Sequence, residues 1–130
     1  LREKGGRLVI PSFAIGRVEE LLYWLQRLEK EARIPSMPTY VDSPMAAEAL
    51  AFYSQRPDEL DPDMRPVHRG PMFDTRRLHV IRDTEESKAL TRSRGPAIII
   101  SSSGMATGGR VLHHLKHLLP DERNTVLFVG

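Results

Sequence analysis

Short apolar runs alternate with amphipathic stretches along this chain. The runs are rich in branched side chains and lie at residues 8–10, 39–41, 78–81, 97–100 and 125–129. Runs that are apolar throughout are typical of strands covered on both faces. Between them, apolar side chains recur at helical spacing, which predicts helices over about 16–32, 43–52, 83–90 and 108–119.

This alternation predicts the fold class. We expect an α/β protein with a parallel (Rossmann-like) sheet of about five strands and helices on both faces. In the first helix, Val18 and Leu22 are expected to face the sheet and Glu19 to face solvent. In the last helix, the expected inward side chains are all apolar: Val111, Leu112, Leu115, Leu118 and Leu119.

Local signals mark where the helices begin. Ser43 is expected to cap a helix that has Pro44 in its first turn, the position that proline prefers. Asp83 followed by Glu86 has the spacing of a capping box. Residues 54–77 differ from the rest: they carry four prolines and many charges without periodicity, which predicts a variable loop or a short irregular excursion.

Length and composition restrict the class of protein. The 130 residues, 40% of them hydrophobic, suit one ordinary domain. The absence of cysteine excludes disulfide scaffolds, thiol nucleophiles and iron–sulfur clusters. No apolar run approaches the roughly 20 residues of a membrane helix, and no secretory leader is evident, so we expect no membrane partner and a cytoplasmic location. The chain begins at Leu1 and stops at Gly130 after an apolar run, which indicates a piece of a longer polypeptide.

The charged residues give a weaker signal. The formal net charge of +2 indicates no particular partner, but only four of the 19 basic residues are lysine. The planar guanidinium of arginine suits phosphate better than the point charge of lysine. A GC-rich genome produces the same bias, so both explanations stay open.

Three loops are candidate ligand sites, because ligands of parallel sheets bind beyond the carboxyl ends of the strands. They are residues 11–17, 42–46 and 101–110. The third loop combines three serines, a threonine and three glycines with Arg110 at the start of a helix. Glycine admits close approach of a ligand, and a helix N-terminus favours an anion. The loop therefore predicts a cradle for phosphate or a nucleic-acid backbone, or else a turn needed only for tight packing.

Other chemistries find less support. The chain has neither a Gly-x-Gly-x-x-Gly nor a Walker-type motif, and its Ser-Ser-Ser-Gly is no hydrolase nucleophile elbow. His113 and His117 lie one helical turn apart and could share a metal, but no third ligand is evident, so a surface position is the simpler interpretation. Asp42 could touch a substrate, although a hydrogen bond at a helix start is the commoner role.

The same three loops resemble a known family. Residues 5–17 with Glu20-Leu21-Leu22, the segment Tyr40-Val41-Asp42-Ser43-Pro44-Met45-Ala46, and residues 103–110 followed by His113-His114-Leu115 are similar to the β-CASP domain of metallo-β-lactamase-fold nucleases. The similarity spans nearly the whole chain and is weakest over 54–77. It is greatest to the prokaryotic RNA-processing members, which are relatives of the nuclease subunit of the cleavage and polyadenylation factor.

The resemblance implies that the parent protein is a zinc-dependent ribonuclease, in which two zinc ions activate a water for attack on a phosphodiester. The β-CASP domain would clamp RNA against the metallo-β-lactamase domain of the same polypeptide. The family's His-x-His-x-Asp-His zinc motif is absent from this chain. No catalytic residue and no metal ligand can therefore be assigned in it, and we expect residues 1–130 to bind RNA without cleaving it.

The positions of the three matching loops give the candidate RNA-binding residues. These are Ser12, Phe13, Gly16, Arg17, Asp42, Ser43, Ser102, Ser103, Gly104, Met105, Thr107, Gly108, Gly109 and Arg110. Two other functions remain open, a mononucleotide-binding module and a non-catalytic scaffold half of an RNA-processing complex. Endo- or exonuclease action, the choice of RNA or DNA, and the oligomeric state are undetermined by the sequence.

Overall fold

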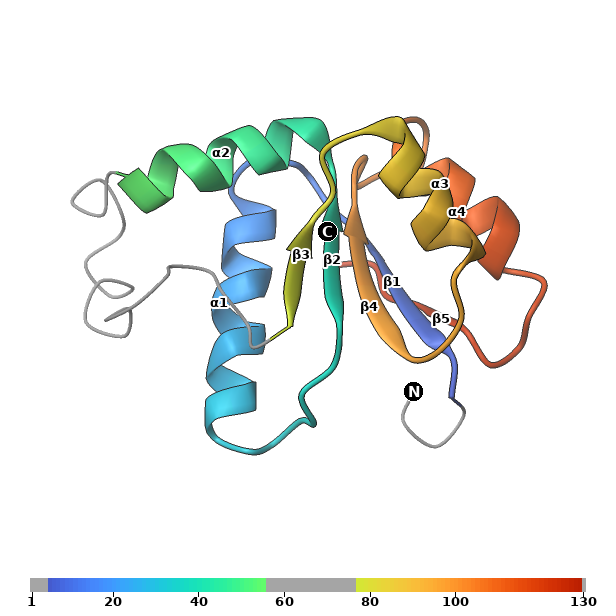
Figure 1. The fold of residues 1–130 in the computed structure, drawn as a ribbon, viewed down its shortest axis with the longest axis horizontal. Helices are drawn as coiled ribbons and strands as arrows, with labels where there is room; N and C mark the ends of the chain where they lie inside the picture. The colour runs from blue at the N-terminus through green and yellow to red at the C-terminus, as the bar shows by residue number, and fades with distance from the viewer. Residues whose placement is uncertain (1–4, 56–76, 130) are drawn as a thin grey trace.

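A computed structural model describes residues 5–55 and 77–129 of this protein (Figure 1). Strands and helices alternate along the chain, as the sequence predicts. The strands are β1 (Arg7–Pro11), β2 (Thr39–Asp42), β3 (Leu78–Val80), β4 (Ala97–Ser101) and β5 (Thr125–Val126). The helices are α1 (Arg17–Lys30), α2 (Pro44–Gln55), α3 (Thr84–Arg92) and α4 (Arg110–Leu118).

The five strands form one parallel sheet in the order β3-β2-β4-β1-β5. The central strand β4 pairs with β1 on one side and with β2 on the other, so that Ile99 lies between Val9 and Tyr40. This central position explains why the run at 97–100 is apolar throughout, because both of its faces are covered. The predicted fold class is confirmed.

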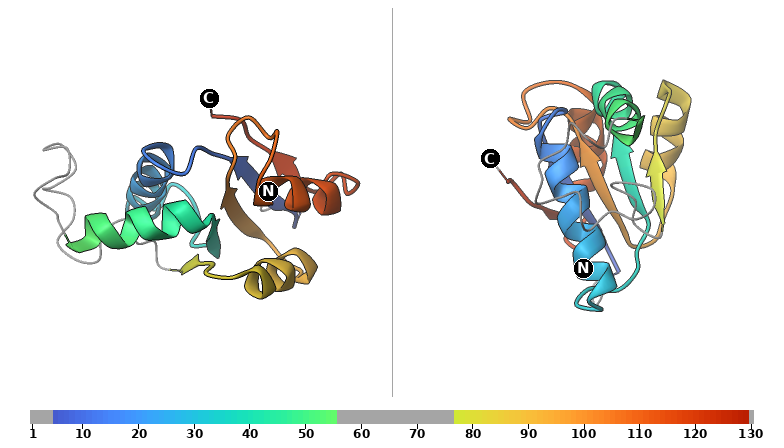
Figure 2. Two further views of the ribbon diagram at one scale, coloured as in Figure 1. Left: turned by 90° about the horizontal axis from the view of Figure 1, so that it is seen from above. Right: turned by 90° about the vertical axis from the view of Figure 1, so that its left-hand side faces the viewer.

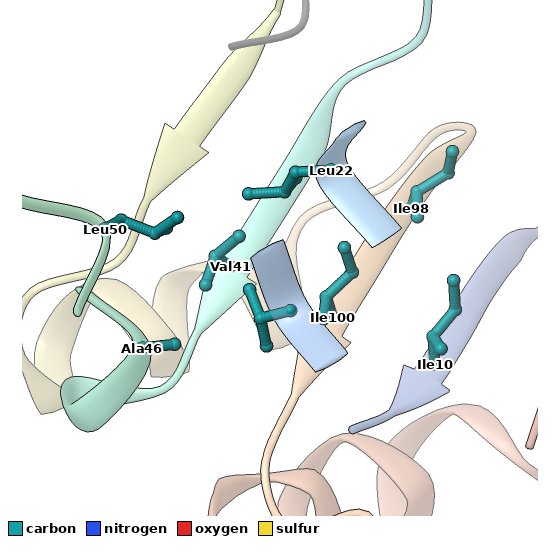
Figure 3. Packing of buried hydrophobic residues seen from close by; sticks show 8 residues of the cluster. Ile10, Leu22, Val41, Ala46, Leu50, Ile98 and Ile100 are labelled. Carbon is teal, nitrogen blue, oxygen red and sulfur yellow. The ribbon is translucent and has the colours of Figure 1, made fainter. Parts of the chain in front are cut away.

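Helices cover both faces of the sheet (Figure 2). Strand side chains point alternately to the two faces, so neighbouring residues of β4 enter different cores. Ile98 and Ile100 pack with side chains of α1 and α2, such as Leu22 and Leu50 (Figure 3). Ile99 packs on the opposite face with side chains of α3 and α4. Each fully buried isoleucine contributes roughly 1.5–3 kcal/mol by leaving water.

The predicted helix starts are confirmed. The Ser43 hydroxyl accepts a hydrogen bond from the Ala46 N–H at 3.3 Å, and Asp83 accepts one from the Glu86 N–H at 2.8 Å. The Glu86 carboxylate accepts in turn from the N–H of Arg82 at 3.0 Å. Helix α2 extends to Gln55, slightly into the segment predicted as a loop, and the prediction for 56–76 lies outside the described residues.

One charged residue of α1 lies where the sequence pattern does not place it. Glu19 was expected to face solvent, but its side chain is buried beside Val18. Burial raises the pKa of Glu19, and the nearby N–H groups of Glu19 and Gly16 offset part of this rise. The expectation was wrong because the buried stripe of α1 is rotated away from the leucine stripe, so that Glu19 is buried while Leu21 and Leu25 are only half-buried.

The apolar face predicted for α4 also requires correction. Val111, Leu115 and Leu118 are buried, whereas Leu112 and Leu119 are exposed. A histidine, His114, has no exposed surface and takes an inward position in the leucine pattern. A buried polar side chain must find hydrogen-bond partners, and those of His114 define the site described below.

The last strand is shorter and more open than predicted. Strand β5 contains only Thr125 and Val126, although the Leu127 N–H still donates to the Val9 carbonyl at 2.9 Å. Leu127 and Phe128 are exposed. The prediction of a buried strand through 129 was wrong because β5 lies at the edge of the sheet, where it pairs with β1 alone. In the described part of the chain, no helix has the length and apolarity to span a membrane.

Candidate nucleic-acid interface

The three predicted loops meet at the carboxyl edge of the sheet. Strands β2, β4 and β1 are direct neighbours and parallel, so the residues that follow them emerge side by side. Hydrogen bonds join the loops: the Ser12 N–H donates to the Ser101 carbonyl at 2.9 Å, and the Ser101 hydroxyl donates to the Asp42 carbonyl at 2.8 Å. The loops therefore form one continuous surface rather than three separate turns.

The chain leaves this edge in two directions. Helices α1 and α2, which follow β1 and β2, pack on one face of the sheet, and α4, which follows β4, packs on the other. Figure 2 shows α4 across the sheet from α1 and α2. Neighbouring strands β1 and β4 thus send their helices to opposite faces, and such switch points are where parallel sheets bind ligands.

The glycines of loop 101–110 are needed for its close contacts. Gly109 has φ +79°, and a Cβ there would lie 2.6 Å from the Ser102 carbonyl oxygen. A Cβ on Gly104 would lie 3.0 Å from the Phe13 backbone nitrogen, since this loop packs against the loop after β1. The glycines thus serve packing, one of the two roles that the sequence left open, while they bring both loops to one place.

Two helices begin at this edge without a side-chain cap. Gly16 and Gly109 occupy the N-cap positions of α1 and α4, and neither can accept a hydrogen bond from the first turn through a side chain. The first N–H groups of a helix carry a partial positive charge and attract anions when nothing else caps them. In α4 the Val111 N–H already donates to the Ser102 carbonyl at 2.8 Å, and the first turn of α1 carries the carboxylates of Glu19 and Glu20. The positive charge at this edge therefore comes mainly from Arg110 in the first turn of α4.

A buried carboxylate organises the side chains at the same edge. Asp42 ends β2 with no exposed side-chain surface. Its Oδ1 accepts from Arg110 Nη1 at 2.7 Å, and its Oδ2 lies 2.6 Å from His114 Nε2 and also accepts from the Ser87 hydroxyl. Because these partners come from α3 and α4, Asp42 ties both helices to the end of the central sheet.

These hydrogen bonds keep Asp42 ionised. Burial by itself would raise its pKa, but the bonds from His114, Ser87 and Arg110 outweigh this effect and lower the pKa of Asp42 below its ordinary value. Since an ionised carboxylate can only accept, His114 carries a proton on Nε2. The other ring nitrogen, Nδ1, lies 3.2 Å from the Thr91 hydroxyl, which fixes the orientation of the ring.

Arg110 links this buried network to solvent. Its side chain is 22% exposed, and one of its five N–H groups is engaged by Asp42. Within the described residues, the guanidinium has no other hydrogen-bonding partner. Arg110 therefore combines a fixed position with free donors, which suits contact with an incoming phosphate.

The candidate RNA-binding residues fall into three groups by exposure. The exposed ones are Phe13, Gly16, Met105, Thr107 and Gly109. The half-buried ones are Arg17, Ser102, Ser103, Gly104, Gly108 and Arg110. The buried ones are Ser12, Asp42 and Ser43.

The buried group holds the edge together and faces no solvent. Ser12 joins β1 to β4, Ser43 caps α2, and Asp42 holds Arg110 and His114. The helix-start hydrogen bond suggested for Asp42 is made by Ser43 instead. Arg17 forms an ion pair with Glu20 at 3.0 Å, so Arg110 is the less engaged of the two arginines.

Sequence reasoning missed three members of the network, His114, Ser87 and Thr91. Their positions weakly indicate burial. His114 lies one turn after Arg110 and next to the inward Leu115. Ser87 lies one turn before Leu90 and Thr91. A polar residue in an apolar helical stripe indicates a partner in the core. The partner itself, Asp42, is 72 residues away from His114 and cannot be identified by spacing.

The residues at this edge do not fit a zinc ion. Zinc sites in proteins need three or four ligands, and no group of three or more histidine, cysteine, aspartate or glutamate residues that could hold a metal occurs in residues 5–55 and 77–129. Asp42 and His114 are close together, but the Arg110 guanidinium already occupies the carboxylate and would repel a cation. His113 and His117 are exposed on α4.

A doubly wound parallel sheet with an arginine at a switch point is typical of proteins that bind phosphate-bearing ligands. Comparison with known proteins identifies the family. The model of the Beta-Casp domain matches residues 18–130. This chain belongs to the Beta-Casp family.

Curated relatives agree with this assignment. The chain is 41% identical over 129 residues to ribonuclease TTHA0252 of Thermus thermophilus, covering 98% of this chain and 30% of the relative. It is 36% identical to the transcription termination factor FttA of Methanocaldococcus jannaschii and to that of Methanothermobacter thermautotrophicus, covering 98% of this chain and 20% of each. The chain thus spans less than a third of the length of these relatives, and the resemblance inferred from its loops is confirmed.

Proposed function

We propose that this domain binds the sugar–phosphate backbone of RNA at the carboxyl edge of its sheet, as part of a zinc-dependent ribonuclease. The observation that carries the proposal is Arg110, held by the buried Asp42 with its remaining donors free beside the N-terminus of α4. The fold, the family and a relative named as a ribonuclease support a nucleic-acid ligand. The aromatic content of 6% argues against a base-stacking platform.

In this proposal the domain positions RNA and does not break the bond. The described residues offer no group of three or more side chains that could hold a zinc ion. Two zinc ions, if bound by the metallo-β-lactamase domain of the same polypeptide, would supply the activated water. The part played by this chain is to hold the backbone through Arg110 and the hydroxyls of loop 101–110, so that residues 1–130 alone bind RNA without cleaving it.

The test is the substitution Arg110→Ala in the full-length polypeptide. We expect RNA affinity to fall roughly tenfold or more, because a hydrogen bond to a charged group is worth about 1.5–3 kcal/mol. The dependence of log Kd on log salt should also lose about one ion equivalent. Binding of a single-stranded RNA oligonucleotide, measured by fluorescence anisotropy over a salt series, reports both quantities.

Arg123→Ala is the matched control. Arg123 pairs with Asp121 at 2.7 Å, the same distance as Arg110 to Asp42, but lies exposed near the opposite edge of the sheet. Unchanged RNA binding in Arg110→Ala would refute the proposal. A thermal shift with mononucleotides but not with RNA would favour the mononucleotide-binding alternative. Binding by the intact polypeptide without cleavage in the presence of zinc would favour the scaffold alternative.

A further inference from the structure

The position of Arg110 depends on a carboxylate that is itself immobilised. The two oxygens of Asp42 have separate roles: Oδ1 receives Arg110 Nη1, and Oδ2 is held by His114 and Ser87. His114 is oriented from its other side by Thr91. Because Oδ2 is fixed by partners on both α3 and α4, the carboxylate cannot rotate, and Oδ1 offers Arg110 a single defined anchor.

The negative charge of Asp42 lies directly beside the positive charge of Arg110. A carboxylate next to a phosphate-binding arginine neutralises part of its charge and so weakens its long-range attraction for RNA. Any gain in RNA affinity from Asp42 must therefore come from the orientation of the Arg110 guanidinium. A long arginine side chain has many rotamers in solvent, and a guanidinium that is already oriented loses less freedom when it binds a ligand.

We propose that Asp42 and His114 are a positioning pair, which sets the Arg110 guanidinium at the carboxyl edge in the orientation that meets an RNA phosphate. This inference rests on the proposed function and assigns Asp42 an action through Arg110 in place of a contact with RNA. His114 acts one step further back, by holding Oδ2 so that Oδ1 faces Arg110. The pair contributes nothing to RNA binding when the guanidinium is absent.

A double-mutant cycle in the full-length polypeptide tests the inference. The four proteins are the wild type, Asp42→Asn, Arg110→Ala and the double variant, with Kd for single-stranded RNA measured over a salt series. We expect Asp42→Asn to weaken binding roughly tenfold in the wild type and to change nothing in the Arg110→Ala background. It should also lower the salt slope by about one, as Arg110→Ala does. Asp121→Asn is the matched control, because it breaks the other aspartate–arginine pair at 2.7 Å.

Two outcomes would overturn the inference while leaving the proposed function intact. An equal loss of affinity with and without Arg110 would mean that Asp42 acts through the fold or through RNA directly. Tighter RNA binding by Asp42→Asn would mean that the carboxylate only neutralises Arg110. If Arg110→Ala itself has no effect, the proposed function fails first, so the two failures are distinguishable.

A second variant keeps the test available if Asp42→Asn does not fold. His114→Gln leaves Asp42 charged and retains an N–H donor near Oδ2, but removes the imidazole contact with Thr91. We expect a smaller loss of RNA affinity, of about threefold, that again disappears in the Arg110→Ala background. A loss that persists without Arg110 would contradict the role of His114 in positioning.

Discussion

The two ends of the sheet differ in charge: a buried carboxylate lies near helix N-termini at one end, and a buried guanidinium lies near a helix C-terminus at the other. At the carboxyl edge, where α1, α2 and α4 begin, the carboxylate of Asp42 is buried between α3 and α4. At the amino edge, Arg7 is buried and donates to the carbonyls of Leu90 and Gly95 near the end of α3. Each charge has the sign that the neighbouring helix dipoles favour.

A hollow lined by arginines at the amino edge shows that basic side chains alone do not define a ligand site. The amino edge has a cavity of about 550 Å³ lined by basic side chains that include Arg92, Arg94 and Arg123. It also lies beside the C-terminal ends of α3 and α4, whose partial negative charge disfavours an anion. Arg92 lies in the last turn of α3 and offsets the charge of that helix end, and Arg123 pairs with Asp121. At the carboxyl edge, Arg110 lies in the first turn of α4, where the helix dipole has the same sign as the guanidinium.

The largest effect is expected from removing the buried carboxylate. Asp42→Ala leaves His114, Ser87 and Arg110 without their acceptor in a buried site, and breaking such a pair costs about 3–5 kcal/mol. Urea denaturation monitored by circular dichroism measures this cost. Asp121→Ala removes the exposed pair and should leave the midpoint nearly unchanged. Equal effects of the two variants would abolish the distinction between the two edges.

A smaller loss of stability is expected at the amino edge. Arg7→Met keeps an unbranched side chain but removes three donors, from Nε to Gly95, from Nη1 to Leu90 and from Nη2 to Ser93. Buried acceptors left unsatisfied cost about 1–3 kcal/mol. RNA affinity should not change, because this arginine serves the helix end. Reduced RNA binding in a folded Arg7→Met protein would show that the amino edge also contacts RNA.

The sequence predicted the fold and the meeting of the loops, because both follow from local patterns. A central strand such as residues 97–100 must be apolar on both faces, and parallel strands bring their carboxyl ends to one edge. The buried network was missed because its geometry is not local. Asp42 was predicted to contact RNA and His114 was noted only as part of a matching segment, so their pairing at 2.6 Å is evident only in the fold. The burial of Glu19 and the short β5 likewise depend on tertiary context.

The smallest expected effect is on the pH dependence of stability, which should respond differently to salt at the two edges. The folded pKa of Asp42 is lowered, so its stabilising contribution is complete above the ordinary pKa near 3.9 and is lost as pH falls towards the folded value. The slope from one such group is at most about 1.4 kcal/mol per pH unit. Asp42→Asn should flatten the decline of stability in acid at both low and high salt, since a buried pair is poorly screened.

Asp121 provides the contrast at the amino edge. Its hydrogen bonds with Arg123 lower the pKa of Asp121 to about 2, in the same direction as for Asp42. Because this pair is exposed, salt screens it, and Asp121→Asn should flatten the acid decline at low salt only. Denaturant titrations between pH 2 and pH 6, at about 0.01 M and about 1 M salt, measure both slopes. If high salt removed the contribution of Asp42 as well, the carboxyl-edge network would be open to solvent and could not hold Arg110 in place.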